Sequence, residues 1–189
     1  MPHSESEGDV VTVLSFLAAP ARLALAGALL LCLSAAAASA DQEEYAVFSA
    51  GAFDINDDKT TAEFRAEYWS GFQLLNLWDR GDVRPFGGVM FTGDSAAYAY
   101  AGVLLDFPLG RRLNLTLSFA PGAFHRGDGK NLGHGLEFRS QIELAYRFSG
   151  GSRLGLAFSH MSNASISENN PGAESLVLTY AFPLSGFLE

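Results

Sequence analysis

A long run of strict two-residue alternation, at residues 136–148, is the feature that most limits what this chain can fold into. Its even positions are mostly large and apolar, as at Phe138 and Ile142, whereas its odd positions carry mainly charged or amide side chains. Successive side chains of a β-strand point to opposite faces, so the run predicts a long strand with one apolar and one polar face. The same alternation recurs at residues 63–68 and 113–119.

The alternation, together with the turn residues between the runs, predicts eight strands. They span residues 44–54, 60–72, 83–92, 96–107, 111–123, 135–149, 152–162 and 174–182. Most approach the roughly 9 to 11 residues that a tilted strand needs to cross the hydrocarbon core of a membrane. From the middle of the chain onward, short turns alternate with long loops, as in barrels with periplasmic turns and external loops.

An even number of strands running up and down can close into a barrel, which leaves no sheet edge unpaired in lipid. We therefore predict an all-β fold, an eight-stranded antiparallel up-and-down transmembrane β-barrel. Alternation alone also suits a secreted, water-soluble sandwich or barrel, in which the apolar faces meet inside. We favour the membrane barrel because of the strand lengths and the loop pattern.

The first forty residues differ from the rest of the chain. Arg22 precedes an apolar stretch at 23–33, and the small residues at 38–40 are those that a signal peptidase requires. We expect a secretory signal peptide at 1–40 and an outer-membrane barrel domain at 41–189.

Composition narrows the range of partners and cofactors. The chain has a net charge of −9, so nucleic acid is not an expected partner. Its single cysteine, Cys32, lies within the predicted signal peptide. His125 and His134 have few other metal ligands near them in the sequence, and we expect neither a metal nor another cofactor.

Charged and aromatic residues within the strands receive structural roles. We expect an ion-paired lining of a nearly filled lumen from Glu137, Arg139, Glu143 and Arg147. We expect an aromatic girdle at the membrane interface from Tyr68, Trp69, Trp78, Tyr98 and Tyr100.

A polar loop between the last two predicted strands holds the candidate site. His160 and Ser162 share strand parity with the apolar residues before the loop, and Glu174 shares parity with those after it. A nucleophile, a general base and a base-orienting acid therefore meet on a lipid-facing surface. Polar groups are costly there, which favours a lipid substrate. With a periplasmic amino terminus, the loop lies at the extracellular rim, where lipopolysaccharide carries ester-linked acyl chains.

The motifs of this region resemble those of the PagL-type lipid A 3-O-deacylases. The resemblance rests on His160-Met161-Ser162-Asn163-Ala164 and on Asn170-Pro171-Gly172 with Glu174, supported by residues 84–88, 98–102 and 135–140. It implies an eight-stranded outer-membrane barrel that hydrolyses the 3-O-linked acyl ester of lipid A.

Carried over to this sequence, the resemblance makes Ser162 the nucleophile, His160 the base and Glu174 the orienting acid. It also implies an oxyanion hole formed by Asn163 or Asn170 with nearby backbone N–H groups. At Ser165 the chain departs from the family, whose motif often continues with glycine. A positive φ there would suit serine less well than glycine.

Two classes of function remain open. The first is a serine esterase acting on lipid A, the lipid part of lipopolysaccharide, from within the outer membrane of a Gram-negative bacterium. The second is a non-catalytic small outer-membrane barrel, structural or adhesive. We favour the enzyme, because a structural barrel has no reason to gather His160, Ser162 and Glu174 on its lipid face. Both a monomer and a homodimer remain open.

Overall fold

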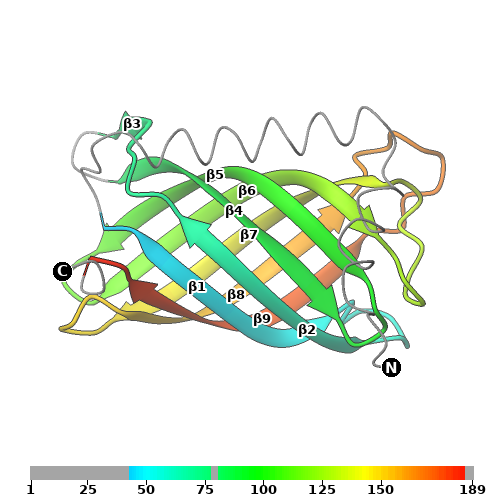
Figure 1. Cartoon of the computed structure of the whole chain (residues 1–189), viewed down its shortest axis with the longest axis horizontal. Coiled ribbons are helices and arrows are strands. Elements are labelled where there is room, and N and C mark those ends of the chain that lie inside the picture. Colours follow the sequence, from blue (N-terminus) through cyan, green and yellow to red (C-terminus); the bar gives the residue numbers. More distant parts are fainter. Residues whose placement is uncertain (1–42, 78–80, 186–189) are drawn as a thin grey trace, which may run out of the picture.

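The computed structural model describes residues 43–77 and 81–185 (Figure 1). Its strands are β1 (Tyr45–Phe53), β2 (Thr61–Trp69), β3 (Leu75–Asn76), β4 (Asp82–Thr92), β5 (Ala97–Leu109), β6 (Leu113–His125), β7 (Leu136–Arg147), β8 (Arg153–Ser162) and β9 (Ala173–Pro183). Within the described ranges, no helix is long and apolar enough to cross a membrane. The predicted signal peptide at 1–40 lies outside the described residues.

The eight long strands close into one antiparallel barrel. Their order around the sheet is β2-β1-β9-β8-β7-β6-β5-β4, and pairing of β2 with β4 joins the two ends. The strands run obliquely to the long axis of the molecule (Figure 1). The two-residue β3 pairs only with the start of β4. The predicted eight-stranded up-and-down barrel is therefore confirmed.

The two faces of the wall have opposite chemistry. Side chains such as Phe48, Phe64 and Leu178 are more than half exposed on the outer surface. Charged side chains, among them Arg65 and Glu143, are buried inside. A water-soluble sandwich would bury its apolar face, so this arrangement is that of a transmembrane barrel.

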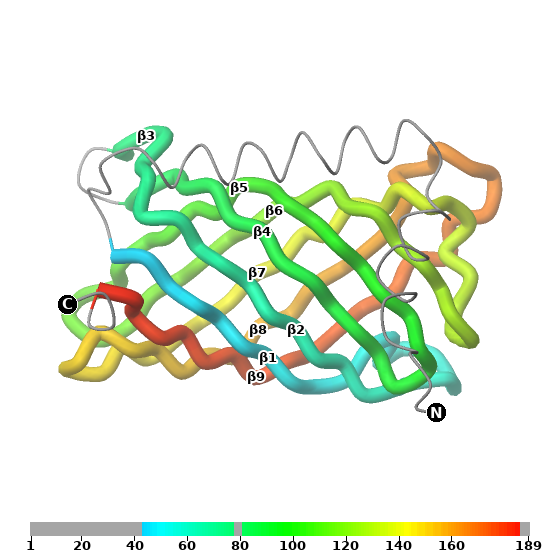
Figure 2. Tube along the Cα trace, viewed as in Figure 1, coloured from blue at the N-terminus to red at the C-terminus, as the bar shows by residue number. Residues whose placement is uncertain are grey.

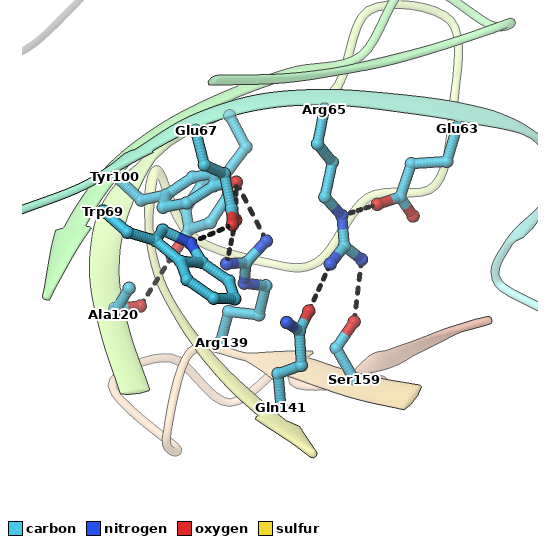
Figure 3. A network of polar contacts seen from close by, with 10 residues as sticks. Glu63, Arg65, Glu67, Trp69, Tyr100, Ala120, Arg139, Gln141 and Ser159 are labelled. Carbon is cyan, nitrogen blue, oxygen red and sulfur yellow. Dashed lines mark hydrogen bonds and ion pairs between the residues drawn. The ribbon is translucent and has the colours of Figure 1, made fainter. Parts of the chain in front are cut away.

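Polar side chains inside the barrel form two groups of hydrogen bonds and ion pairs, one around Arg65 and one around Glu67 and Arg139 (Figure 3). Arg139 on β7 forms an ion pair with Glu67 on β2, with 2.6 Å between Nη2 and Oε1. The Tyr100 hydroxyl donates to the same carboxylate oxygen at 2.6 Å, and Trp69 Nε1 donates to Glu67 Oε2 at 3.0 Å. Glu67 and Arg139 compensate each other's charge, so β2 and β7 can keep this pair away from water.

The network corrects two sequence-based assignments. Trp69, Tyr98 and Tyr100 are buried in the lumen and do not form an interface girdle. Their positions share the inward parity of neighbouring polar residues, which aromatic content alone does not reveal. The predicted ion-paired lining is only partly right because, of its four residues, only Arg139 forms an ion pair in the part of the chain that the structure describes, with Glu67 on β2. Glu137 and Glu143 are buried but form no ion pair among the described residues, and Arg147 is exposed.

The connections gather at the two ends of the barrel (Figure 2). The segments 54–60, 93–96, 126–135 and 163–172 lie at one end, which we call the loop end. The short turns 110–112 and 148–152 lie at the opposite end, which we call the turn end. The candidate residues therefore belong to the loop end.

Candidate active site

The antiparallel register of β8 and β9 places His160 directly opposite Glu174. His160 Nδ1 lies 2.9 Å from Glu174 Oε1, a hydrogen-bond distance. In the tautomer with the proton on Nδ1, this N–H donates a hydrogen bond to the carboxylate, and Nε2 is the free basic nitrogen of the ring. The pair thus has the geometry of a general base held by an orienting acid.

This pair lies on the outer surface of the barrel. The side chain of His160 is 48% exposed and that of Glu174 is 26% exposed. The neighbours of His160 in sequence, Ser159 and Met161, are buried, whereas Phe158 two residues earlier is exposed. Strand parity therefore points the pair outward, in the direction that the alternation of the sequence predicts.

Ser162 is the last residue of β8 and shares the parity of His160. It lies opposite Phe138 of β7 and is half-buried. Its hydroxyl has no hydrogen-bond partner among the described residues. Catalytic hydrogen bonds are often long or poorly aligned without substrate and tighten when it binds.

Asn163 is fully buried and fastens the loop that follows Ser162. Its Nδ2 donates to the carbonyl oxygens of Leu132 and Asn169, both at 2.8 Å. Its backbone N–H donates to Asn170 Oδ1 at 3.0 Å. The two asparagines proposed for the oxyanion hole therefore already hold the loop in shape.

Two consecutive residues after Asn163 adopt left-handed backbone conformations. The φ of Ala164 is 53° and that of Ser165 is 63°. Such a conformation is unfavourable for side chains other than glycine and is found where surrounding contacts impose it. The backbone N–H groups of both residues have no acceptor among the described residues, so they are available to a ligand.

Gly172 lies against the ring of His160. Its φ is +67°, and a Cβ added there would lie 2.8 Å from His160 Cε1. Only glycine fits both the backbone conformation and the space. The Asn-Pro-Gly motif was a signal for this position, but sequence reasoning gave Gly172 no role beside the imidazole.

A contact between loops was missing from the sequence interpretation. Lys130 in segment 126–135 pairs with Asp54 at 2.9 Å and Asp57 at 3.2 Å. Side-chain hydrogen bonding to Lys130 lowers the pKa of Asp57. Burial lowers the pKa of Lys130, but its hydrogen bonds to Asp54 and Asp57 outweigh burial and raise it overall. The charged forms of Asp57 and Lys130 are thereby favoured, and their ion pair ties the segment 54–60 (the first loop) to the segment 126–135 (the third loop).

Comparison with known proteins agrees with the motifs. The model of the lipid A 3-O-deacylase (PagL) family matches residues 60–183. Lipid A deacylase PagL of Bordetella bronchiseptica is 30% identical over 125 residues, which cover 65% of this chain and 61% of that relative. The chain thus spans about three fifths of the relative's length.

Solved structures agree on the fold. The crystal structure of the outer membrane enzyme PagL matches with a TM-score of 0.58 at 22% identity, covering 74% of this chain and 99% of that one. A de novo designed transmembrane β-barrel matches with a TM-score of 0.51 at 8% identity, covering 74% of this chain and 95% of the design. With the family model spanning β2 to β9, the chain belongs to the lipid A 3-O-deacylase (PagL) family.

Proposed function

We propose that the protein is an outer-membrane esterase that hydrolyses the 3-O-linked acyl chain of lipid A. The observation that carries the proposal is the outward-facing pair of His160 and Glu174, 2.9 Å apart, with Ser162 two residues along the same strand face. Membership of the family supports the same reaction.

The reaction proceeds by acyl transfer through the serine. Ser162 Oγ attacks the ester carbonyl while His160 Nε2 takes the hydroxyl proton, and Glu174 stabilises the resulting imidazolium. Collapse of the tetrahedral intermediate breaks the bond to the sugar oxygen, which receives the proton from His160. Water, deprotonated by the same imidazole, then attacks the acyl-serine and releases the fatty acid, which restores Ser162.

The oxyanion of each tetrahedral intermediate needs hydrogen-bond donors. We assign these to the free backbone N–H groups of Ala164 and Ser165, because consecutive amides in a tight left-handed turn form an anion-binding concavity. Asn163 and Asn170 support this turn through their own hydrogen bonds. A preorganised donor of this kind typically contributes about 3 to 4 kcal/mol.

The position of the site suits a membrane-resident ester. In the proposed orientation the loop end faces the outside of the cell, so His160 and Ser162 lie at the extracellular rim beside the outer leaflet. The exposed apolar side chains below them, such as Phe158 and Leu156, contact acyl chains. The substrate is therefore hydrolysed without leaving the membrane.

Single substitutions at Ser162 and His160 test the proposal. We expect Ser162→Ala and His160→Ala each to abolish release of one acyl chain from lipid A, measured by mass spectrometry of lipid A from expressing cells. The double variant should be no worse than either single, because members of one nucleophilic unit are strongly non-additive. Ser152→Ala, at the turn end, is the matched control and should leave the release unchanged.

Fold and location are checked on the same samples. All variants should fractionate with outer membranes and migrate anomalously on a detergent gel when unheated, because rim residues contribute little to barrel closure. Substantial turnover by Ser162→Ala would exclude Ser162 as nucleophile. Lipid A left intact by the unmodified protein would favour the alternative, a non-catalytic structural or adhesive barrel.

A further inference from the structure

We propose that a pocket in the third loop binds a phosphate group of the substrate's headgroup, with Arg126 as its principal ligand. The inference builds on the proposed esterase function and adds a second recognition element to it. Lipid A is a phosphorylated sugar carrying acyl chains, so a site that reads it has an anion to bind as well as an ester to cut.

The pocket lies between the two limbs of the loop that joins β6 to β7. It has a volume of about 330 Å³. Its lining consists of Phe124, His125, Arg126, Asn131, Leu132, Gly133, His134 and Gly135. The lining therefore includes an arginine and two histidines, residue types whose side chains carry N–H donors.

Arg126 is available for a ligand, unlike the other cation of the loop. Lys130 is already held by Asp54 and Asp57. Arg126 is exposed and forms no ion pair within residues 43–77 and 81–185. The chain has a net charge of −9, yet this arginine lines a pocket without a carboxylate partner among the residues described, so its charge can attract an anion. The planar fork of arginine matches phosphate oxygens in a bidentate way.

Asp128, the acidic residue of this loop, is not part of the pocket. The backbone N–H of Asp128 donates to the carbonyl oxygen of Asp94 at 2.9 Å, which ties this part of the loop to the segment 93–96. Asp128 is not among the lining residues. The pocket is therefore lined without a carboxylate that would repel an anion.

The pocket and the esterase site share a wall. The carbonyl of Leu132, a lining residue, accepts the hydrogen bond from Asn163 Nδ2 at 2.8 Å, and Asn163 directly follows Ser162. Gly133 is also in close contact with the segment 163–172, since a Cβ added to Gly133 would lie 1.8 Å from the carbonyl oxygen of Asn169. A sugar whose ester reaches Ser162 thus extends its neighbouring substituents toward this pocket.

A pair of synthetic substrates tests the assignment. We would assay purified full-length protein in detergent micelles on 3-O-acylated glucosamine lipids that differ only in a 1-phosphate. The unmodified protein should prefer the phosphorylated lipid, with a ratio of kcat/KM values of about tenfold or more. In Arg126→Ala this preference should fall about tenfold, chiefly through KM, and Arg126→Lys should restore part of it. Arg111→Ala, which removes an exposed arginine at the turn end, should keep the full preference.

The outcomes separate this inference from the proposed function. If the unmodified protein hydrolyses neither lipid, the esterase proposal fails and the pocket assignment fails with it. If both lipids are cut but Arg126→Ala keeps the preference, the pocket assignment alone is wrong. An equal loss of the preference in Arg111→Ala would also overturn it, because the effect would then follow the net charge of the protein and not the pocket.

Discussion

At the scale of single residues, the imidazole of His160 is held from two directions. Glu174 contacts Nδ1 at 2.9 Å, and the backbone of Gly172 lies beside Cε1 on the ring edge. The ring is 48% exposed, so solvent or lipid reaches its remaining surface. Two neighbours thus fix the orientation of a side chain that packing on the outer wall does not constrain.

Glu174→Ala should lower the rate of deacylation without erasing it. In the proposed mechanism Ser162 and His160 remain in place, and the orienting acid is the less indispensable member of such a unit, by a factor of tens in a comparable hydrolase. Glu174→Gln keeps a hydrogen-bond acceptor without the charge and should lie between the alanine variant and the unmodified protein. Initial rates on purified lipid A check the order. A Glu174→Ala rate as low as that of Ser162→Ala would contradict it.

Gly172→Ala should reduce activity by displacing the His160 ring. The added Cβ would meet the ring at 2.8 Å, and the left-handed φ adds strain of about 1 kcal/mol or more. Gly110→Ala is a matched control, because Gly110 has a φ of +73° but nothing within 4 Å of an added Cβ. Both variants should lose similar stability in denaturant unfolding, and only Gly172→Ala should lose activity. Equal activity in the two would show that the glycine serves the turn alone.

At the scale of elements, the third loop is the centre of the loop end. Its Lys130 reaches the first loop, the backbone of Asp128 bonds to the second, and Leu132 accepts from the fourth. The turn that follows Ser162 is therefore held by Leu132, a residue far away in the sequence. Because the contacts run through one segment, disturbing it should affect the whole loop end.

The ion pairs of Lys130 stabilise the segment 126–135 only over a limited range of pH. The lowered pKa of Asp57 means that its contribution is present above the ordinary aspartate value of about 4 and is lost as pH falls through the lowered value. The raised pKa of Lys130 means that its contribution is full below about 10.5 and is lost as pH rises through the raised value.

A spin label attached through Asp128→Cys reports on this range. Its mobility should stay constant from about pH 5 to pH 9 and rise below about pH 4. Lys130→Met should raise the mobility at neutral pH, whereas Lys59→Met, an exposed lysine of the first loop, should not. Mobility that is unchanged in Lys130→Met would mean that the ion pairs do not hold the loop.

The strands were predictable from the sequence, whereas the loop contacts were not. Every long strand was placed within two residues at each end except at the end of β2, where aromatic residues continue past Trp69. The two-residue β3 is too short to show a period. The His160–Glu174 pair followed from parity and antiparallel register. The Lys130–Asp54 contact joins residues 76 apart, and no periodic pattern marks such a pair.

At the scale of the whole molecule, the interior of the barrel holds a buried polar network beside a buried apolar cluster that includes Met90 and Leu104. Arg139, Glu67 and Tyr100 are all buried, and their charges and hydroxyl satisfy one another. Removing one partner leaves the other buried without compensation, whereas removing both leaves no unpaired charge. The lumen therefore couples β2, β5 and β7 through specific partners.

Arg139→Met alone should destabilise the barrel by about 3 to 5 kcal/mol, because it leaves the Glu67 carboxylate without its cation. The double variant Arg139→Met with Glu67→Leu should be more stable than the single variant. Denaturant unfolding in lipid vesicles measures the difference, with Arg111→Met as an exposed control. A double variant less stable than the single would contradict this, because Glu67 would then still stabilise the barrel without Arg139, through Trp69 and Tyr100.

If the outward-facing pair of His160 and Glu174 is catalytic, as we propose, its place on the outside of the barrel also sets the kind of kinetics to expect. The substrate then reaches the site by lateral diffusion within the lipid leaflet, so the relevant concentration is the mole fraction of substrate among neighbouring lipids. Diluting the substrate with inert lipid at constant bulk amount should slow the reaction in proportion. The fatty acid and the trimmed lipid remain in the same layer after the bond is cut, so turnover depends on how fast that layer mixes around the protein.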